Sequence, residues 1–287
     1  MGCSSSSFRI KPDSNLHEWD YSDTNSWAVN FPSANGRNQS PIDIISSLSE
    51  YDESLKTNQF ELNFDLNCFI ELKNNGHTFV VSAASDTSSV SGGLLPNSYK
   101  FGQFHMHWGL NESSGSEHFV DGGSFAGELH FVFWNDSKFS TFETAAQSND
   151  HDGLAVFAVF IIVGAENNEF SKITAAIDNA DKPMPFLLMA DALLVFTINQ
   201  HLFGCNWYYN ISKYWTYLGS LTTPPCTESV LWTVFHDPIQ ISIGQLNKVR
   251  QLYSCAHESD CTESKRIKKN NRLPCELNER KIIRSFD

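Results

Sequence analysis

Alternating apolar and polar residues mark several segments of this chain as strands. The clearest are residues 99–109, with the sequence Y-K-F-G-Q-F-H-M-H-W-G, and residues 127–135, with the sequence G-E-L-H-F-V-F-W-N. Residues 154–164 form a longer apolar run, rich in β-branched and aromatic side chains, which is typical of a strand buried on both faces. Similar patterns, separated in many places by polar turns, predict further strands at 60–66, 68–73, 77–83, 193–198, 214–218 and 229–235.

Helical periodicity is confined to three short stretches, near 141–149, 169–179 and 242–252. Many strands and few helices in one long chain predict a mainly β (α+β) fold with short helices at the periphery. No internal repeat or long linker divides the 287 residues. We therefore expect a flexible segment at 1–15, followed by a single folded domain at 16–287.

Two histidines lie in the first of these strands. His105 and His107 are two residues apart, so their side chains point to the same face of a strand. Two imidazoles are costly to bury in an apolar setting unless something satisfies both, and a metal ion would do so. Taken alone, such a pair is more often a satisfied pair of core histidines.

A third histidine, His130, lies in the strand 127–135. If the two strands are neighbours with their faces aligned, three imidazoles meet and leave one position open, as in catalytic zinc sites. Gln103 and Glu128 each lie two residues before a histidine, on the same face, where they can hold its other ring nitrogen. This repeated arrangement favours the metal site.

The overall charge limits the class of partner. A formal net charge of -13 and a pI near 5.1 argue against a nucleic-acid partner, because binding to phosphate requires a basic surface. The one basic run, residues 264–272, is interpreted as a solvated surface segment.

The first residues, M-G-C-S-S-S, lack the apolar region of a secretory signal. They match the pattern for myristoylation at Gly2, with Cys3 as a candidate for palmitoylation. Two acyl chains would anchor the protein stably to a membrane, whereas a disordered polar terminus is the alternative. Seven cysteines without a secretory signal favour free thiols, although Cys255 and Cys261 could pair in an oxidising compartment.

Four further motifs, together with the two strands that contain the histidines, form a pattern along the chain. With this pattern the chain resembles the α-class carbonic anhydrases from about His17 to Ser285. The motifs are Q-S-P-I-D-I at 39–44, N-N-G-H at 74–77, G-S-E-H at 115–118 and Y-W-T-Y-L-G-S-L-T-T-P-P at 214–225. The resemblance implies a large twisted, mostly antiparallel sheet of about ten strands. It also implies zinc-dependent, reversible hydration of carbon dioxide to bicarbonate and a proton.

The resemblance also implies roles for individual residues. His105, His107 and His130 would hold one catalytic Zn²⁺, with water or hydroxide at the open position. Thr222 would accept a hydrogen bond from that hydroxide and donate its own proton to Glu117. His77 resembles the proton shuttle of the fast members, and Tyr21 and Asn75 resemble residues that order its water chain. The substrate site would be lined by Val132, Val156, Leu221, Thr223, Val230 and Trp232.

Departures from the family pattern bear on location and activity. Val80 stands where fast members commonly carry a polar residue. Secreted relatives pair a cysteine at the position of Cys226 with one at the position of Ala34, so that disulfide cannot form here. The chain ends at Asp287 without a hydrophobic tail, and we expect an intracellular protein, held at the inner face of a membrane if its N-terminus is acylated.

Two other functions stay open. A non-catalytic binding module of the same fold is the main alternative, and a structural zinc protein with its open position blocked is another. The presence of all three histidines, Glu117 and Thr222 argues against the binding module.

Overall fold

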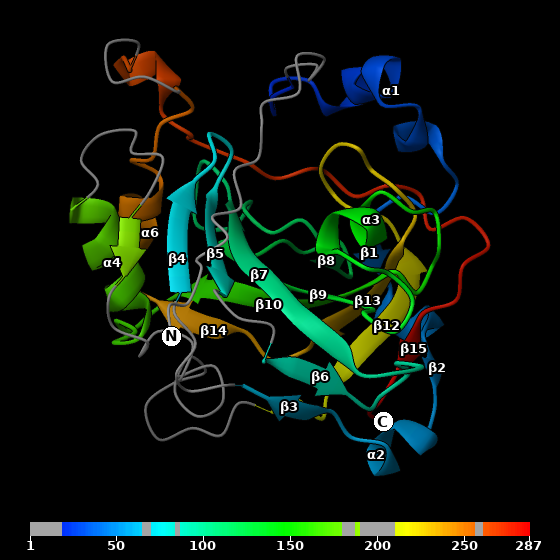
Figure 1. The fold of residues 1–287 in the computed structure, drawn as a ribbon. Helices are drawn as coiled ribbons and strands as arrows, with labels where there is room; N and C mark the ends of the chain where they lie inside the picture. The colour runs from blue at the N-terminus through cyan, green and yellow to red at the C-terminus, as the bar shows by residue number, and fades with distance from the viewer. Residues whose placement is uncertain (1–18, 65–69, 84–86, 180–186, 190–209, 256–260) are drawn as a thin grey trace, which may run out of the picture.

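A large twisted sheet runs through the molecule (Figure 1). The computed structural model describes residues 19–64, 70–83, 87–179, 187–189, 210–255 and 261–287. Within them, the sheet has 13 strands, of which ten follow the order β11-β4-β5-β7-β9-β10-β13-β12-β15-β2. Strand β14 pairs with β10, β6 pairs with β7, and β3 pairs with β6, while β1 and β8 form a separate two-stranded sheet.

The strands have these bounds: β1 Asp43–Ile44, β2 Glu50–Tyr51, β3 Glu61–Asn63, β4 Ile70–Asn74, β5 Phe79–Ala83, β6 Ser89–Ser91, β7 Tyr99–Trp108, β8 Phe119–Val120, β9 Gly127–Trp134, β10 Leu154–Val163, β11 Leu187–Met189, β12 Tyr214–Gly219, β13 Val230–Phe235, β14 Ile239–Ile241 and β15 Ile283–Arg284. The α-helices are α1 Trp27–Asn30, α2 Ser54–Thr57, α3 Phe142–Ala146, α4 Phe170–Asn179 and α6 Ile243–Val249. Single 3₁₀ turns are η1 Thr24–Ser26, η2 Pro32–Asn35, η3 Ser46–Leu48 and η5 Glu263–Lys265.

The prediction of a mainly β fold with short peripheral helices is confirmed. Most pairings are antiparallel, but β10 pairs in parallel with β13 and β14, and β15 with β2. The described sheet also has more strands than the predicted ten, because several edge strands are only two or three residues long. The predicted strand 193–198 and the segment 1–15 with Gly2 and Cys3 lie outside the described residues.

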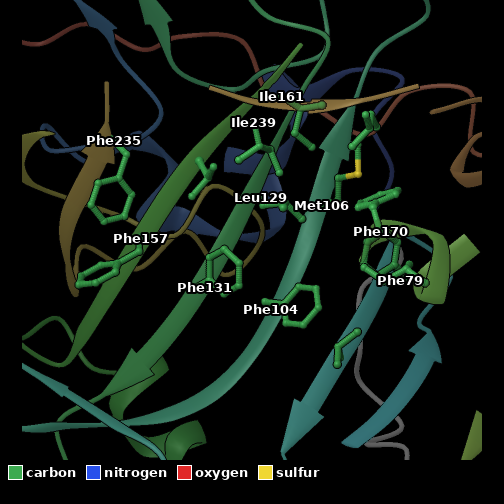
Figure 2. Packing of buried hydrophobic residues seen from close by; sticks show 14 of the residues in the cluster. Phe79, Phe104, Met106, Leu129, Phe131, Phe157, Ile161, Phe170, Phe235 and Ile239 are labelled. Carbon is green, nitrogen blue, oxygen red and sulfur yellow. The ribbon is translucent and has the colours of Figure 1, made fainter. Parts of the chain in front are cut away.

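Alternation along β7 and β9 separates an apolar face from a polar one. Phe104 and Met106 of β7, and Leu129 and Phe131 of β9, point into the main hydrophobic core (Figure 2). Each is at most 3% exposed, and full burial of such a side chain contributes about 1.5–3 kcal/mol. The histidines of the same strands therefore lie on the opposite face.

The structure decides between the two alternatives that the sequence left open for Cys255 and Cys261. The two residues form a disulfide, with Cα atoms 5.5 Å apart. The local backbone brings them together: Tyr253 pairs with Arg266, and the N–H of Ser254 donates to the carbonyl of Lys265. Cys226 and Cys275 are free thiols.

No helix in the described part of the chain has the length and apolar character that a membrane crossing requires.

Candidate metal centre

Three imidazoles meet on the polar face of the sheet. Strands β7 and β9 are antiparallel neighbours, and their register places His105 opposite His130 and His107 opposite Glu128. The ring centroids lie 5.0 Å apart for His105 and His107, 5.2 Å for His105 and His130, and 4.6 Å for His107 and His130. One nitrogen from each ring lies within 4.8 Å of the other two, so the three side chains could hold a metal ion.

A polar partner holds the second nitrogen of each ring. His105 Nδ1 lies 2.9 Å from Gln103 Oε1, His107 Nδ1 lies 2.7 Å from the carbonyl oxygen of Asn270, and His130 Nε2 lies 2.7 Å from Glu128 Oε1. Because each partner is an oxygen acceptor, the histidine nitrogen carries the proton. Nε2 of His105, Nε2 of His107 and Nδ1 of His130 are then left with lone pairs for a metal.

The three imidazole rings are in the uncharged form that a metal ion requires. Burial, reinforced by the neighbouring rings, lowers the pKa of His105 well below its ordinary value and that of His107 to about 3. Burial also lowers the pKa of His130. All three are therefore neutral at physiological pH, as metal ligands must be.

One nitrogen of the cluster lacks a partner that a metal ion would supply. Nε2 of His107 is buried and has no hydrogen-bond partner among the described residues. A buried polar atom without a partner costs about 1–3 kcal/mol. A cation bound between the rings would remove this cost, and three imidazole nitrogens are a donor set that suits zinc.

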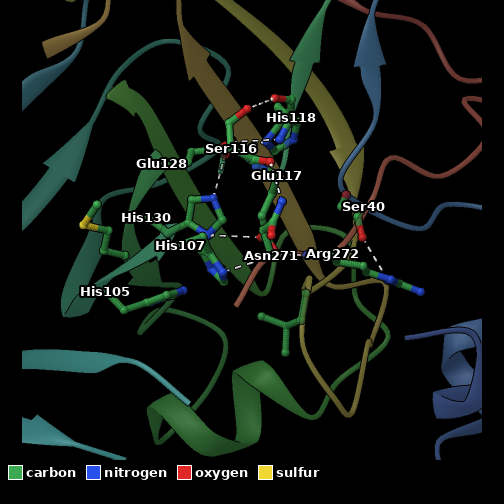
Figure 3. A network of polar contacts seen from close by, with 12 residues as sticks. Ser40, His105, His107, Ser116, Glu117, His118, Glu128, His130, Asn271 and Arg272 are labelled. Carbon is green, nitrogen blue, oxygen red and sulfur yellow. Dashed lines mark hydrogen bonds and ion pairs between the residues drawn. The ribbon is translucent and has the colours of Figure 1, made fainter. Parts of the chain in front are cut away.

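Glu128 is the centre of a buried network behind His130 (Figure 3). Its Oε1 lies 2.7 Å from both His130 Nε2 and His118 Nδ1, and its Oε2 accepts from the N–H groups of Glu117 at 2.9 Å and His118 at 2.8 Å. His118 Nε2 in turn lies 2.7 Å from the hydroxyl of Tyr217. Burial acts to raise the pKa of Glu128, but the charge interaction with His118 and the hydrogen bonds from His118 and His130 outweigh it and lower the pKa, so Glu128 is ionised and orients His130. His118, Glu128 and His130 also meet the geometric conditions for a metal group, but hydrogen bonds between them already account for their contact.

Glu117 lies beside the rings of His107 and His130 and is fully buried. Its Oε1 accepts from the N–H of Arg272 at 2.8 Å and lies 3.3 Å from His107 Nδ1. Burial and the charge of Glu128 raise the pKa of Glu117 well above its ordinary value, while Arg272 and the Thr222 side chain act to lower it. Glu117 Oε2 has no hydrogen-bond partner among the described residues. The side chain of Thr222 is nevertheless near enough to the carboxyl group to act on its pKa. A bound cation would favour the ionised form of Glu117.

An apolar wall adjoins the histidines. Val132, Val156, Val230 and Trp232 belong to one buried cluster, against which Leu221 packs. The register places Val156 next to Val132 on β9 and next to Trp232 on β13. The centroid of the Trp232 ring lies 4.9 Å from that of the His130 ring, so this apolar cluster reaches the three histidines. Thr223 is partly exposed and accepts from the N–H of Cys226 in the turn that follows Thr222.

His77 lies in the turn between β4 and β5. Its ring stacks on Trp19 with centroids 3.8 Å apart and an interplanar angle of 4°. Burial lowers the pKa of His77, and the charge of Asp20 acts to raise it. Asn75 closes the turn, because its Oδ1 accepts from the N–H of His77 at 2.9 Å. Tyr21 is buried and packs edge-on against Trp19.

Val80, at the start of β5, pairs with His105 in the sheet. Its side chain is therefore on the same face of the sheet as the three histidines, next to His105.

Sequence reasoning missed three residues of this centre. Asn270 and Arg272 reach it from the C-terminal segment, 163 and 155 residues away from His107 and Glu117. His118 follows Glu117 directly, but nothing in a loop motif indicates which side chain will contact Glu128. A cluster of three neutral imidazoles, with His107 and His130 buried and His105 partly exposed, thus lies on adjacent strands of a large mixed sheet and defines a β-sheet protein with a candidate three-histidine metal site.

Comparison with known proteins makes this class specific. Residues 22–286 match the model of the eukaryotic-type carbonic anhydrase family. The chain is 36% identical to carbonic anhydrase 3 of Homo sapiens over 277 residues, which cover 94% of this chain and 98% of the relative. It is 38% identical to carbonic anhydrase 7 of Homo sapiens over 282 residues, with 94% and 98% covered, and 38% identical to carbonic anhydrase 1 of Monodelphis domestica over 276 residues, with 93% and 98% covered. The chain belongs to the eukaryotic-type carbonic anhydrase family, and the predicted resemblance is confirmed.

Proposed function

We propose that this protein is an active zinc carbonic anhydrase that interconverts carbon dioxide and bicarbonate. The observation that carries the proposal is the unpartnered, buried Nε2 of His107 in a cluster of three neutral imidazoles. The family is zinc-dependent, and His105, His107 and His130 would hold the ion. When bound, Zn²⁺ lowers the pKa of water enough to supply hydroxide near neutral pH.

Thr222 and Glu117 orient the nucleophile. With Glu117 ionised, the Thr222 hydroxyl would donate its proton to the carboxylate, which can only accept, and would accept a hydrogen bond from the attacking hydroxide. The bond from Thr222 to Glu117 is not formed among the described residues. Glu117 is itself held by the N–H of Arg272 at 2.8 Å. With the ion bound, this chain of donors and acceptors would direct the lone pair of the hydroxide towards the substrate carbon.

The substrate side of the site is the apolar wall. Carbon dioxide is small and uncharged, so it needs a dry surface beside the nucleophile and no ionic partner. Val132, Val156 and Trp232 supply such a surface at most 3% exposed, with Val230 and Leu221 beside them. Thr223 follows Thr222 and is partly exposed, and we expect it to contact the more polar bicarbonate product.

The direct test is a carbon dioxide hydration assay of the purified protein before and after a chelator removes zinc. Turnover that disappears with zinc and returns on its re-addition is expected. Bound zinc without turnover would indicate a structural zinc protein instead. Neither zinc nor turnover would indicate a binding module of the same fold.

His77 is proposed as the proton carrier, with Tyr21 and Asn75 ordering the water that connects it to the centre. Changing His77 to Ala should lower kcat by about one to two orders of magnitude. General acid–base groups typically contribute about 100-fold or more to a rate, so the expected loss is at or below the lower end of that range. Zinc content and kcat/KM should be retained, because His77 contacts no metal ligand in the structure described here. Stopped-flow hydration with added imidazole checks this, since a small diffusing base should restore part of the rate. An unchanged kcat would remove His77 from the pathway.

We also propose that the N-terminus is acylated at Gly2 and Cys3 and holds the protein at the inner face of a membrane. The support is the sequence M-G-C-S-S-S, and two acyl chains bind membranes stably where one does not. Changing Gly2 to Ala should move the protein from the membrane fraction to the soluble fraction of its native cells, and changing Cys3 to Ser should do so in part. Fractionation followed by immunoblotting measures both. A wild-type protein already in the soluble fraction would contradict this proposal.

A further inference from the structure

One buried amide group connects the metal ligands to the turn that carries His77. Strands β5 and β7 pair from Ser82 and Gln103 as far as Val80 and His105. Beyond Val80, the side chain of Asn270 lies between the two segments. Its Nδ2 donates to the carbonyl of His77 at 3.0 Å on one side and to that of Met106 at 2.9 Å on the other.

The rest of Asn270 is bound to β7. Its Oδ1 accepts from the N–H of Trp108 at 2.7 Å, and its own N–H donates to the Trp108 carbonyl at 3.0 Å. Its carbonyl oxygen lies 2.7 Å from Nδ1 of His107. Asn270 is 0% exposed, so water does not compete for these bonds. A single buried residue therefore contacts both His107, a proposed metal ligand, and the backbone of His77.

The turn that contains His77 depends on such bonds because it lies outside the paired part of β5. Asn74 Oδ1 accepts from the N–H of Gly76, whose φ of 85° is left-handed, and Asn74 Nδ2 donates to the carbonyl of Tyr253. These contacts hold the start of the turn. The bond from Asn270 holds the carbonyl of His77. The ring of the same residue stacks on Trp19.

We propose that Asn270 is a positioning residue, whose side-chain amide sets the place of His77 relative to the metal ligands. This rests on the proposed function, in which His77 carries the proton. Transfer through a short water chain depends on the separation and orientation of its ends, and small displacements of a reacting group have large effects on rate.

Changing Asn270 to Ala removes the side-chain bonds and leaves the backbone carbonyl for His107. The hydroxyl of Thr78 still donates to the Met106 carbonyl at 2.6 Å, so β5 stays attached to β7. We expect kcat for hydration to fall about tenfold, with zinc content unchanged and kcat/KM within about twofold, because only the proton-transfer geometry is altered. Changing Asn271 to Ala is the matched control, since its side chain donates to the carbonyls of Ser114 and Ser116 and makes no contact with the turn. That variant should keep the wild-type kcat.

A double-mutant cycle separates positioning of His77 from a general structural role. Asn270→Ala combined with His77→Ala should be no slower than His77→Ala alone, and imidazole should bring both to the same rate. Losses that multiply, or equal falls in kcat and kcat/KM, would overturn the proposal. A normal kcat in His77→Ala would instead overturn the proposed shuttle.

A more conservative variant, Asn270→Ser, tests the proposal even if Asn270→Ala does not fold. Asn270→Ser keeps a hydroxyl donor and should lose less kcat than Asn270→Ala, with its zinc intact. If both variants lose zinc, the side chain supports the metal centre itself, and the proposal that it acts on the turn is wrong.

Discussion

Changing His105 to Ala is expected to abolish tight zinc binding and carbon dioxide hydration together. Two imidazoles remain, whereas catalytic zinc sites in proteins use three protein ligands. Loss of an outer-shell partner typically costs 10–100-fold in metal affinity, and loss of a ligand itself should exceed about 100-fold. Metal analysis after dialysis and a hydration assay measure the two quantities on one sample.

The control is another histidine in the same chain. His151 is exposed and distant in sequence from the cluster, so His151→Ala should keep its zinc and its activity. Added zinc should raise the melting temperature of the wild type and of His151→Ala but not of His105→Ala, because only a native state that binds the ion is stabilised by it. Full hydration by a metal-free His105→Ala protein would refute the zinc assignment.

The parts of the fold that were predicted from sequence are those with a strong local period. The predicted strands at 99–109, 127–135 and 154–164 each end within one residue of β7, β9 and β10. By contrast, β1 and β8 have two residues each and exist because they pair with each other across 75 residues or more of chain. A two-residue strand contains no period, so sequence patterns cannot indicate it.

The same distinction applies to the metal centre. Gln103 and Glu128 could be proposed because side chains two residues apart on a strand share a face, and the structure places each beside its histidine. Asn270 and Arg272 contact His107 and Glu117 through backbone atoms, and a backbone contact leaves little trace in residue type. The local backbone geometry brings Cys255 and Cys261 together in a disulfide. From sequence, whether the two cysteines pair could be argued only from the cellular compartment.

Changing Thr222 to Ala should lower kcat/KM for hydration by about two orders of magnitude, the effect typical of losing one preorganised hydrogen-bonding group at a reacting oxygen. Zinc content should not change, because Thr222 forms no hydrogen bond with any of the three imidazoles in the described structure. The loss arises from orientation: without the hydroxyl, the attacking oxygen has no partner that links it to Glu117. Stopped-flow hydration at several carbon dioxide concentrations gives kcat/KM directly.

Two further variants show whether the hydroxyl and the carboxylate act as one unit. Thr222→Ser restores the hydroxyl without the methyl group and should regain most of the lost rate. Glu117→Gln keeps the shape of the side chain but replaces one acceptor oxygen by an N–H donor, so the hydroxyl of Thr222 loses its acceptor at that position. If Thr222 acts through Glu117, Glu117→Gln combined with Thr222→Ala should be little slower than the worse single variant, because the second change removes an interaction already lost. Wild-type kcat/KM in Thr222→Ala, or effects that multiply in the double variant, would show that the two side chains do not form one hydrogen-bonded path.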